Sequence, residues 1–459
     1  QRTMCNHEED FRPAEDETAG QHPFRQLFLD AMVTEEYAGL KRVFHAAKKY
    51  RGNRVVVADK PWEGTGIAAG GTVMWRGNKI TVRYKCWPPK TTAGACMAES
   101  EDGIHFTKPN LGLVEWEGSK DNNICGSHGS IIKMRNPISP RHRWGYYGYG
   151  GKGDAAVSFG ETGLRSDGTD RRTGLFKTSD VVYFFYDLYE DRYVSTFKTA
   201  NRRHRAVGIA ISKDGLEWHK PVELGPVFGA DELDPDPTQV YGMPVFPYQG
   251  WYIGLPWLYH ARWMKWGVYD TPKKMYEAQE GTPCTIDTHF AWSWDLVSWN
   301  RTPERKPFIP LGKPGSWDCE MVASARNPVV VGDNLYFYYG GYSTVHDTLE
   351  AKCAVGLAIL RMDGFCSFKA GKQEGWLISR REVFQTPRVT INAVTRPGGY
   401  VTAELVDRWN NVIPGFSREE CVPFEGDSVR HELQWRKKKF PPFPGRTVIS
   451  RVDIVAWMP

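Results

Sequence analysis

The chain has 459 residues, of which 41 % are hydrophobic and 25 % charged, and its formal net charge is +5. These values are ordinary for a soluble globular protein and allow about two to four domains. The basic clusters are short, unlike the dense stripes that bind nucleic acid. No apolar run approaches the roughly 18 residues that span a membrane. We therefore expect neither a nucleic-acid partner nor a membrane partner.

Aromatic residues are unusually frequent, with 18 Trp, 21 Tyr and 22 Phe. Large rings suit the half-buried surface of β-strands, and they also form flat walls against which sugars stack. The nine Cys residues never form a C-x-x-C pair, which argues against a zinc ribbon or a redox motif. We expect them to be buried as small hydrophobic residues.

Residues 1–51 are predicted to form an N-terminal tail and a helix. The first 22 residues are polar and acidic without periodicity, which is typical of a mobile tail. In Glu35–Lys49, Leu40, Val43, Phe44 and Ala47 recur at helical spacing, which predicts the one long helix of the chain.

After residue 52 the sequence changes to short apolar segments separated by Gly, Pro, Asn and Asp, and one pattern repeats. Each copy is an apolar strand, a tight turn of the Asp-Gly type and then usually an aromatic residue. Asp-Gly supplies the positive φ that such a turn needs. Copies begin at residues 95, 156, 207, 290 and 355.

Two further strand-like segments precede each copy, which gives five repeats of at least three strands at a spacing of about 40–60 residues. That arrangement is typical of a β-propeller. We predict an all-β fold in which residues 52–375 form a catalytic five-bladed β-propeller. An open solenoid of five units is the alternative, but the irregular loops between the repeats favour the propeller.

Residues 376–459 differ in character. Segments such as Val389–Val394 and Tyr400–Val406 alternate apolar and polar residues, with a turn at Pro397-Gly398-Gly399 between them. This alternation predicts a C-terminal antiparallel β-sandwich.

Several strings resemble the superfamily of glycoside hydrolase families 32 and 43, closest to bacterial members with a C-terminal β-sandwich. The resemblance covers about residues 52–459, and the strings are Ser100-Glu-Asp-Gly-Ile-His-Phe106, Asp59-Lys-Pro-Trp-Glu63, Gln239-Val-Tyr-Gly-Met243 and Tyr338-Tyr-Gly-Gly341. The resemblance implies a propeller that carries a glycosidase site. The family 32 motifs themselves do not occur, and their nearest counterparts are Asp59-Lys-Pro61 and Asp318-Cys-Glu320.

Glycoside hydrolysis needs one protonated and one ionised carboxyl group across the scissile bond. The innermost strands of a propeller converge on its axis, so acids that precede those strands are the candidates. We predict Glu320 as general acid, because Trp317 and Met321 beside it could raise its pKa by desolvation. Asp59 is predicted as nucleophile or base and Asp180 as the carboxylate that orients the sugar.

Polar and aromatic residues near the same strand ends are the predicted substrate ligands. No H-x-H, H-E-x-x-H or EF-hand string occurs, so we predict no metal site and no cofactor. The predicted ligands are His128, Arg205, Asp236, Gln239, Tyr241, His346, Trp62 and Trp257.

The leading hypothesis is therefore a secreted or periplasmic, exo-acting glycoside hydrolase that acts on a polysaccharide or oligosaccharide. One alternative is a polysaccharide lyase that works through His128, Tyr241 and Arg205. Another is a propeller that binds carbohydrate without catalysis, since propellers host many functions. The sequence does not indicate the sugar, the stereochemical outcome or the oligomeric state.

Overall fold

The computed structural model describes most of the chain between residues 25 and 458. No helix among these residues is long and apolar enough to cross a membrane. The described residues are 25–30, 34–87, 94–126, 129–166, 168, 170–201, 204–221, 223, 225–235, 238–260, 284–346, 351–379, 389–407, 409, 411–436 and 455–458.

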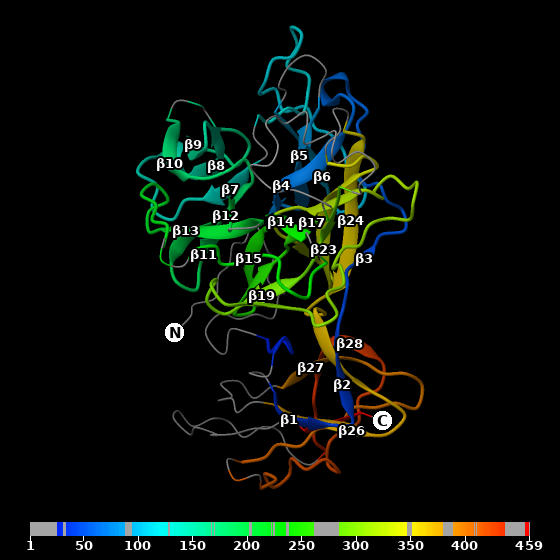
Figure 1. The fold of residues 1–459 in the computed structure, drawn as a ribbon. Helices are drawn as coiled ribbons and strands as arrows, with labels where there is room; N and C mark the ends of the chain where they lie inside the picture. The colour runs from blue at the N-terminus through cyan, green and yellow to red at the C-terminus, as the bar shows by residue number, and fades with distance from the viewer. Residues whose placement is uncertain are drawn as a thin grey trace. The chain divides into compact units, whose positions relative to one another are not determined.

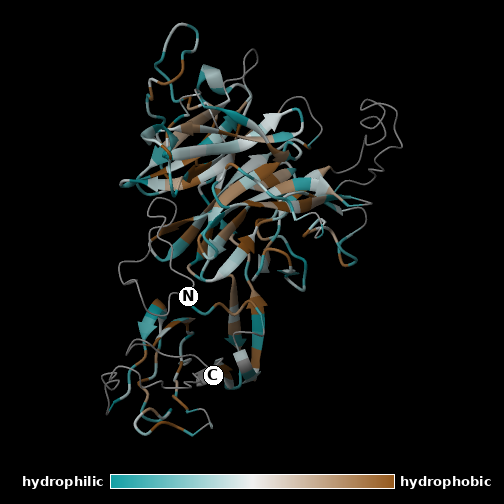
Figure 2. Ribbon diagram, turned by 90° about the vertical axis from the view of Figure 1, so that its left-hand side faces the viewer, coloured by the Kyte–Doolittle hydropathy of each residue, from teal (hydrophilic) through white to brown (hydrophobic). Residues whose placement is uncertain are grey.

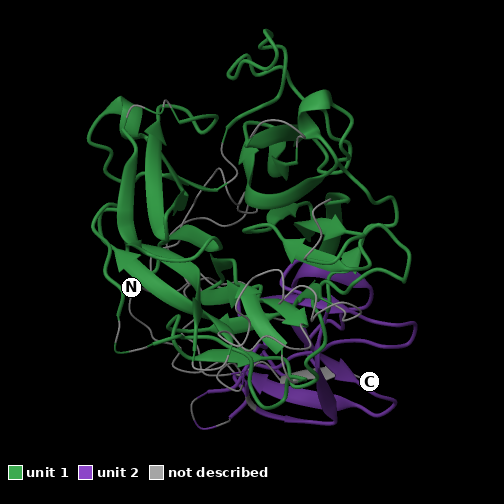
Figure 3. Cartoon of the chain, turned by 45° about the horizontal axis from the view of Figure 1, so that its top comes forward, with its two compact units in different colours: residues 1–14, 46–359 green, residues 15–45, 360–459 purple. Residues whose placement is uncertain are grey.

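The chain forms two compact units (Figure 3). The described part of the first lies within residues 46–359, and that of the second lies within residues 15–45 and 360–459. Strands near both ends of the chain thus belong to one unit. The division into 1–51, 52–375 and 376–459 stays a prediction.

Nearly all of the first unit's described residues outside loops are in strands, so the all-β class is confirmed (Figure 1). Short 3-10 helices, among them Pro61–Glu63 and Pro140–His142, lie between strands. We assign the strands to five groups that follow the sequence repeats. The strands, group by group, are β4 (Ile67–Arg76), β5 (Lys79–Cys86) and β6 (Ala95–Ser100); β7 (Ser130–Lys133), β8 (Trp144–Gly151), β9 (Asp154–Gly160) and β10 (Arg172–Lys177); β11 (Val182–Asp187), β12 (Arg192–Ala200) and β13 (Arg205–Ser212); β14 (Thr238–Gly242), β15 (Val245–Tyr248), β16 (Trp251–Gly254), β17 (Trp257–His260), β18 (Thr285–Thr288), β19 (Ala291–Ser293) and β20 (Trp299–Arg301); and β21 (Met321–Ser324), β22 (Val329–Val331), β23 (Asn334–Tyr342), β24 (Cys353–Arg361) and β3 (Lys48–Lys49). Strands β14, β17 and β18 nevertheless share one sheet with the last group through the parallel pair of β18 and β21, and β15, β16, β19 and β20 form another sheet.

Strands of successive groups lie against one another, and the series closes. Strand β4 contacts β7, β7 contacts β11 and β11 contacts β15. Strand β18 pairs with β21 in parallel, and β21 contacts β4. The last group therefore contacts the first, so strands that are far apart in the sequence lie near one another.

Apolar side chains fill the space between the sheets, and Figure 2 shows hydrophobic residues along the strands of this unit. One core cluster joins β4 and β5 to β23 and β24, with Val73, Val82 and Tyr338 fully buried. Another joins β11 to β14 and β17 through Phe185, Val240 and Leu258. Burial of each such side chain contributes about 1.5–3 kcal/mol.

Three of the predicted turns have the same hydrogen bonds. In the turn after β13, the Ser212 hydroxyl donates to Asp214, and Asp214 accepts from the backbone N–H groups of Leu216 and Glu217. Gly215 donates its N–H to Ser212 and has a φ of 79°. The turns at Ser100–His105 and Ser293–Ser298 repeat these bonds, which confirms the turn in three of the five copies read from the sequence.

The helix predicted over Glu35–Lys49 is wrong, because these residues form strands β1 (Thr34–Ala38), β2 (Leu40–Phe44) and β3. Gly39, at a φ of 69°, separates the first two strands. Strand β1 pairs with β26 (Gly375–Ser379), and β2 pairs with β25 (Cys366–Ala370). Val43 and Phe44 suit strands as well as helices, so distant partners decided their conformation.

The described part of the second unit contains short antiparallel pairs. Besides β1 and β2, it contains β27 (Thr390–Val394), which pairs with β28 (Asp427–Glu432), and β29 (Val455–Met458), which pairs with β26. Phe416 and Trp435 are buried with their rings edge to face at 5.3 Å. These two residues belong to one core cluster of the second unit, together with Val389, Leu405 and Leu433.

The turn after β13 gives a test of this repeat. In Gly215→Ala the new Cβ would lie 2.3 Å from the Tyr147 hydroxyl oxygen at a positive φ. Both effects destabilise, so we expect a loss of about 3 kcal/mol in the free energy of unfolding, measured with denaturant. Gly77→Ala is the control, because Gly77 has a φ of 60° and nothing within 4 Å of its Cβ position. It should lose only about 1 kcal/mol, and an equal loss in both variants would contradict the argument.

Candidate functional site

Asp59 lies in the loop before the first strand group. Its carboxylate accepts a hydrogen bond of 2.5 Å from Lys108 Nζ, and its side chain is 54 % exposed. The same ammonium lies 2.6 Å from Glu63, which is fully buried and also accepts from the Tyr84 hydroxyl. Partial burial favours protonation of Asp59, but Lys108 outweighs it and lowers the pKa of Asp59. An ionised Asp59 fits its predicted role as nucleophile or base.

Asp180 lies just before β11 and is ion-paired with Lys198 of β12. Burial favours protonation of the carboxyl, but Lys198 outweighs it and lowers the pKa of Asp180. The Lys198 side chain is only 10 % exposed, and this burial lowers the pKa of its ammonium, against the effect of Asp180. Asp180 itself is 56 % exposed, so its ionised oxygens face solvent.

Glu320 directly precedes β21 and is half-buried. Two backbone hydrogen bonds hold Glu320 in place. Its N–H donates to the carbonyl of Tyr342, and its carbonyl accepts from the N–H of Ile286. The Cys319 sulfur lies 3.6 Å from its carboxylate.

Three other acids near strand ends are held by partners inside the fold. Asp187 accepts from Tyr252 and Arg192, Asp234 accepts both ends of the Arg301 guanidinium, and Asp318 binds Lys49 and Tyr339. All three side chains are buried and fully engaged, which indicates a structural role for each of them.

Aromatic and cationic side chains gather around Tyr241 of β14. The Tyr241 hydroxyl and His346 Nε2 are 2.8 Å apart, and their rings meet edge to face. Lys198 Nζ lies 4.3 Å from the centroid of the Tyr241 ring, and the Arg205 guanidinium lies 5.3 Å from the centroids of both Tyr241 and Tyr259. We call this set, with Asp180, the Tyr241 cluster: Asp180, Lys198, Arg205, Tyr241, Tyr259 and His346.

Further rings extend the Tyr241 cluster toward the other strand groups. Tyr183 of β11 meets Trp257 of β17 edge to face at 5.6 Å, and Trp87 meets Tyr342 of β23 at 6.1 Å. Burial raises the pKa of Tyr183, and Tyr342, Tyr241 and Asp180 add to the effect. Rings from four of the five groups therefore surround one region.

The three predicted catalytic acids lie on segments that border this region. The charge of Asp180 contributes to the raised pKa of Tyr183. Glu320 donates its backbone N–H to the carbonyl of Tyr342. Trp87 donates its backbone N–H to the carbonyl of Glu63, which lies four residues after Asp59. The distances between their carboxyl groups, and their catalytic roles, stay predictions.

Gln239 of β14 lies opposite Tyr259 in the register of β14 and β17. It is fully buried, and within the described part of the chain neither its Oε1 nor its Nε2 has a hydrogen-bond partner. A buried amide without partners costs about 1–3 kcal/mol. Groups kept at such a cost commonly serve a ligand or a bound water.

The remaining predicted ligands divide into two kinds. His128 and Asp236 lie outside the described residues. Trp62 is half-buried and donates Nε1–H to Asn123, and Trp257 is buried and donates to the Ser324 hydroxyl. Trp257 thus packs beneath the Tyr241 cluster, and its ring is not an exposed wall.

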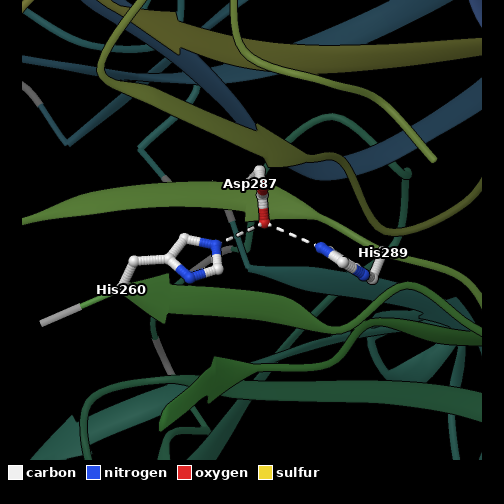
Figure 4. Close-up of side chains that lie close together, drawn as sticks. All are labelled: His260, Asp287 and His289. Atoms are coloured by element: carbon white, nitrogen blue, oxygen red, sulfur yellow. Dashed lines mark hydrogen bonds and ion pairs between the residues drawn. The ribbon is translucent and has the colours of Figure 1, made fainter. Parts of the chain in front are cut away.

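A second polar group lies on the opposite face of the sheet. His260 Nε2 and His289 Nε2 each lie 3.0 Å from the same oxygen, Oδ1 of Asp287 (Figure 4). Burial favours protonation of Asp287, but the two imidazoles beside its carboxylate outweigh burial and lower its pKa to about 2. Burial opposes the charged form of His260, but Asp287 outweighs it and raises the pKa of His260. We call these residues the His260 triad.

From the sequence, His289 is a polar candidate, but Lys198, Tyr259, and the grouping of His289 with His260 and Asp287 were not predicted. Lys198 and Tyr259 lie within strands, and no motif in the sequence around them indicates a functional role. The triad had a usable signal, since Asp287-x-His289 on a strand puts both side chains on one face. The H-x-H string has the same spacing but requires two imidazoles, so it does not reveal a pair in which Asp287 takes the first place.

No protein-family model matches the chain, and no curated protein does. Among solved structures, similarity is found to the catalytic domain of a family 62 α-L-arabinofuranosidase from Coprinopsis cinerea, with 11 % identity, 69 % of this chain and 97 % of that chain covered, and a TM-score of 0.43. A thermostable family 43 glycoside hydrolase shows 14 % identity over 66 % and 93 % of the chains, with a TM-score of 0.40. The β-1,2-mannobiose phosphorylase from Listeria innocua, in its β-1,2-mannobiose complex, shows 12 % identity over 69 % and 97 %, with a TM-score of 0.43.

Each of these similarities concerns the fold alone.

Gln239 gives a test of the site. Gln239→Leu removes an unpartnered buried amide, so the free energy of unfolding should stay the same or rise by up to about 1–3 kcal/mol. Asn123→Leu is the control, because Asn123 is equally buried but bonds Trp62, Tyr84 and the backbone of Met97. It should lose about 2–4 kcal/mol. Denaturant unfolding measures both, and a clear loss in Gln239→Leu would show that the amide has a structural partner.

Proposed function

We propose that this protein is a glycoside hydrolase that binds a saccharide at the Tyr241 cluster. The proposal is based on one observation: the Tyr241 cluster brings aromatic rings together with two cations, Lys198 and Arg205, and one ionised carboxylate, that of Asp180. Tyr241 and His346 offer ring faces and edges, and Asp180, Arg205 and His346 offer hydrogen-bonding groups. Sugars are recognised by this combination of apolar ring faces and directed polar groups.

The proposed chemistry assigns one role to each of the three acids. Glu320 is the general acid that protonates the leaving oxygen, and Asp59 is the nucleophile or the base that activates water. Asp180 binds sugar hydroxyls near the developing positive charge. The lowered pKa values of Asp59 and Asp180 support roles that need an ionised carboxylate.

The same proposal includes a five-bladed β-propeller and a C-terminal β-sandwich. The five antiparallel groups and the contact of β21 with β4 support the closed propeller. The buried pair of Phe416 and Trp435 supports a separate core in the C-terminal part. We further propose exo-action, and a secreted or periplasmic location, since an extracellular polysaccharide is too large to enter a cell before it is cleaved.

A second candidate function is a polysaccharide lyase, and one observation favours it. Arg205 and Lys198 lie over the Tyr241 ring, and His346 bonds the Tyr241 hydroxyl. A lyase needs cations that neutralise a uronate and a Tyr or His that moves the proton α to its carboxylate. The Tyr241 cluster contains both kinds of group.

A screen of the full-length protein against neutral and uronate-containing polysaccharides tests both functions. New reducing ends without ultraviolet absorbance would support the hydrolase. Absorbance of an unsaturated uronate would support the lyase. Binding without either product would contradict both and leave a carbohydrate-binding propeller.

Glu320→Gln tests the assigned general acid. It should keep the fold and lower turnover by about 100-fold or more, with a smaller loss for substrates whose leaving groups need no protonation. Asp59→Asn should abolish turnover with every substrate. Glu101→Gln, at an exposed turn, is the matched control and should leave turnover unchanged. Wild-type turnover in Glu320→Gln would show that another group is the acid.

A further inference from the structure

The His260 triad combines two imidazoles and one carboxylate on neighbouring strands. In the antiparallel register His260 lies opposite Thr285, and Leu258 lies opposite Asp287. Residues two apart on a strand share a face, so Leu258 and His260 share one face with Asp287 and His289. His260 and Asp287 are diagonal neighbours, which is within reach of long side chains. The arrangement is therefore built into two paired strands and does not depend on a loop.

We propose that the His260 triad binds one divalent transition-metal ion of the zinc type through His260 Nε2, Asp287 Oδ1 and His289 Nε2. One ring nitrogen of each His and a carboxylate oxygen of Asp287 all lie within 4.8 Å of one another. Two imidazole nitrogens and one carboxylate oxygen are a ligand set that Zn²⁺ accepts in three-ligand sites. The proposal is independent of the proposed glycosidase, because it concerns the other face of the sheet.

The distances require little movement. With metal–ligand bonds of about 2.0–2.2 Å, tetrahedral ligands lie roughly 3.3 Å from one another. Each imidazole nitrogen is now 3.0 Å from Asp287 Oδ1. Shifts of a few tenths of an ångström would open these two contacts to coordination distance. The two imidazole rings would also turn, so that their nitrogens approach the same separation from each other.

The direction of the His289 ring supports a shared ligand. Its side chain is 6 % exposed, and its Nε2 lies at contact distance from Asp287. Yet within the described residues this nitrogen makes no hydrogen bond of acceptable geometry. A buried nitrogen that contacts a carboxylate without bonding it well is oriented as a ligand beside another ligand.

Access and charge also fit. His260 is 29 % exposed, whereas Asp287 and His289 are nearly buried, so an ion would enter past His260 and keep an open position there. With neutral imidazoles the three side chains carry one negative charge. The nearby Asp234 adds a second negative charge, which is balanced by Arg301.

The experiment uses the full-length protein after removal of metal with a chelator and dialysis. Zn²⁺ is titrated calorimetrically, and the thermal midpoint is measured with and without it. We expect one ion per chain at micromolar affinity or tighter, and a higher midpoint with Zn²⁺. Co²⁺ should give a visible absorption band from the same site.

His260→Ala and Asp287→Asn should each weaken Zn²⁺ binding by about 100-fold or more. Asp287→Asn keeps the shape of the side chain, and circular dichroism of both variants checks the fold. His105→Ala is the control, because His105 and Asp102 form an exposed His–Asp pair at 2.6 Å without a second imidazole. It should bind Zn²⁺ like the parent protein. No binding by the parent, or unchanged binding in either triad variant, would overturn the proposal and leave a hydrogen-bonded triad.

Discussion

The fold of the first unit depends on buried hydroxyl groups that join one strand group to the next. Where two groups meet, their first strands do not form a full backbone ladder, and buried N–H groups need other partners. Thr72 of β4 accepts from the N–H of Ile131 of β7, and Ser130 of β7 accepts from the N–H of Phe184 of β11. Each bond satisfies a donor that burial would otherwise leave unpaired.

The same device continues around the series. The Thr196 hydroxyl donates to the carbonyl of Met243 after β14, and Thr288 of β18 accepts from the N–H of Ser324. The last link is Arg326, whose guanidinium donates to Thr72 and to the carbonyl of Ile131. These groups are all buried. Single polar contacts thus fix how each sheet meets the next, and the positions of Tyr183, Tyr241 and Tyr342 follow from them.

Local sequence patterns predicted the turns whose hydrogen bonds are made within a few residues. The Ser-x-Asp-Gly turns were found because Ser212, Asp214 and Gly215 complete their bonds within a few residues. The region from Glu35 to Lys49 was misjudged because its partners are more than 300 residues away in sequence. Helical spacing of apolar residues cannot reveal a strand partner at that distance.

The site was predictable in part for the same reason. Arg205, Tyr241 and His346 were chosen one by one for their chemistry, and the structure brings them together with Lys198 and Tyr259. That grouping depends on which strand ends meet, which no local pattern contains. The Gln239 amide is buried and has no hydrogen-bond partner among the described residues. This too results from tertiary packing and could not be predicted from its neighbours in the sequence.

Strand β17 shows how closely the two polar groups are tied to one register. Tyr259 belongs to the Tyr241 cluster and His260 to the His260 triad, and consecutive strand residues point to opposite faces. A slip of one residue would exchange the two side chains and destroy both arrangements. The register is held by the pairing of β17 with β14 and β18 and by burial of Leu258 between them. The packing of one short strand therefore positions the proposed saccharide site and the proposed metal site together.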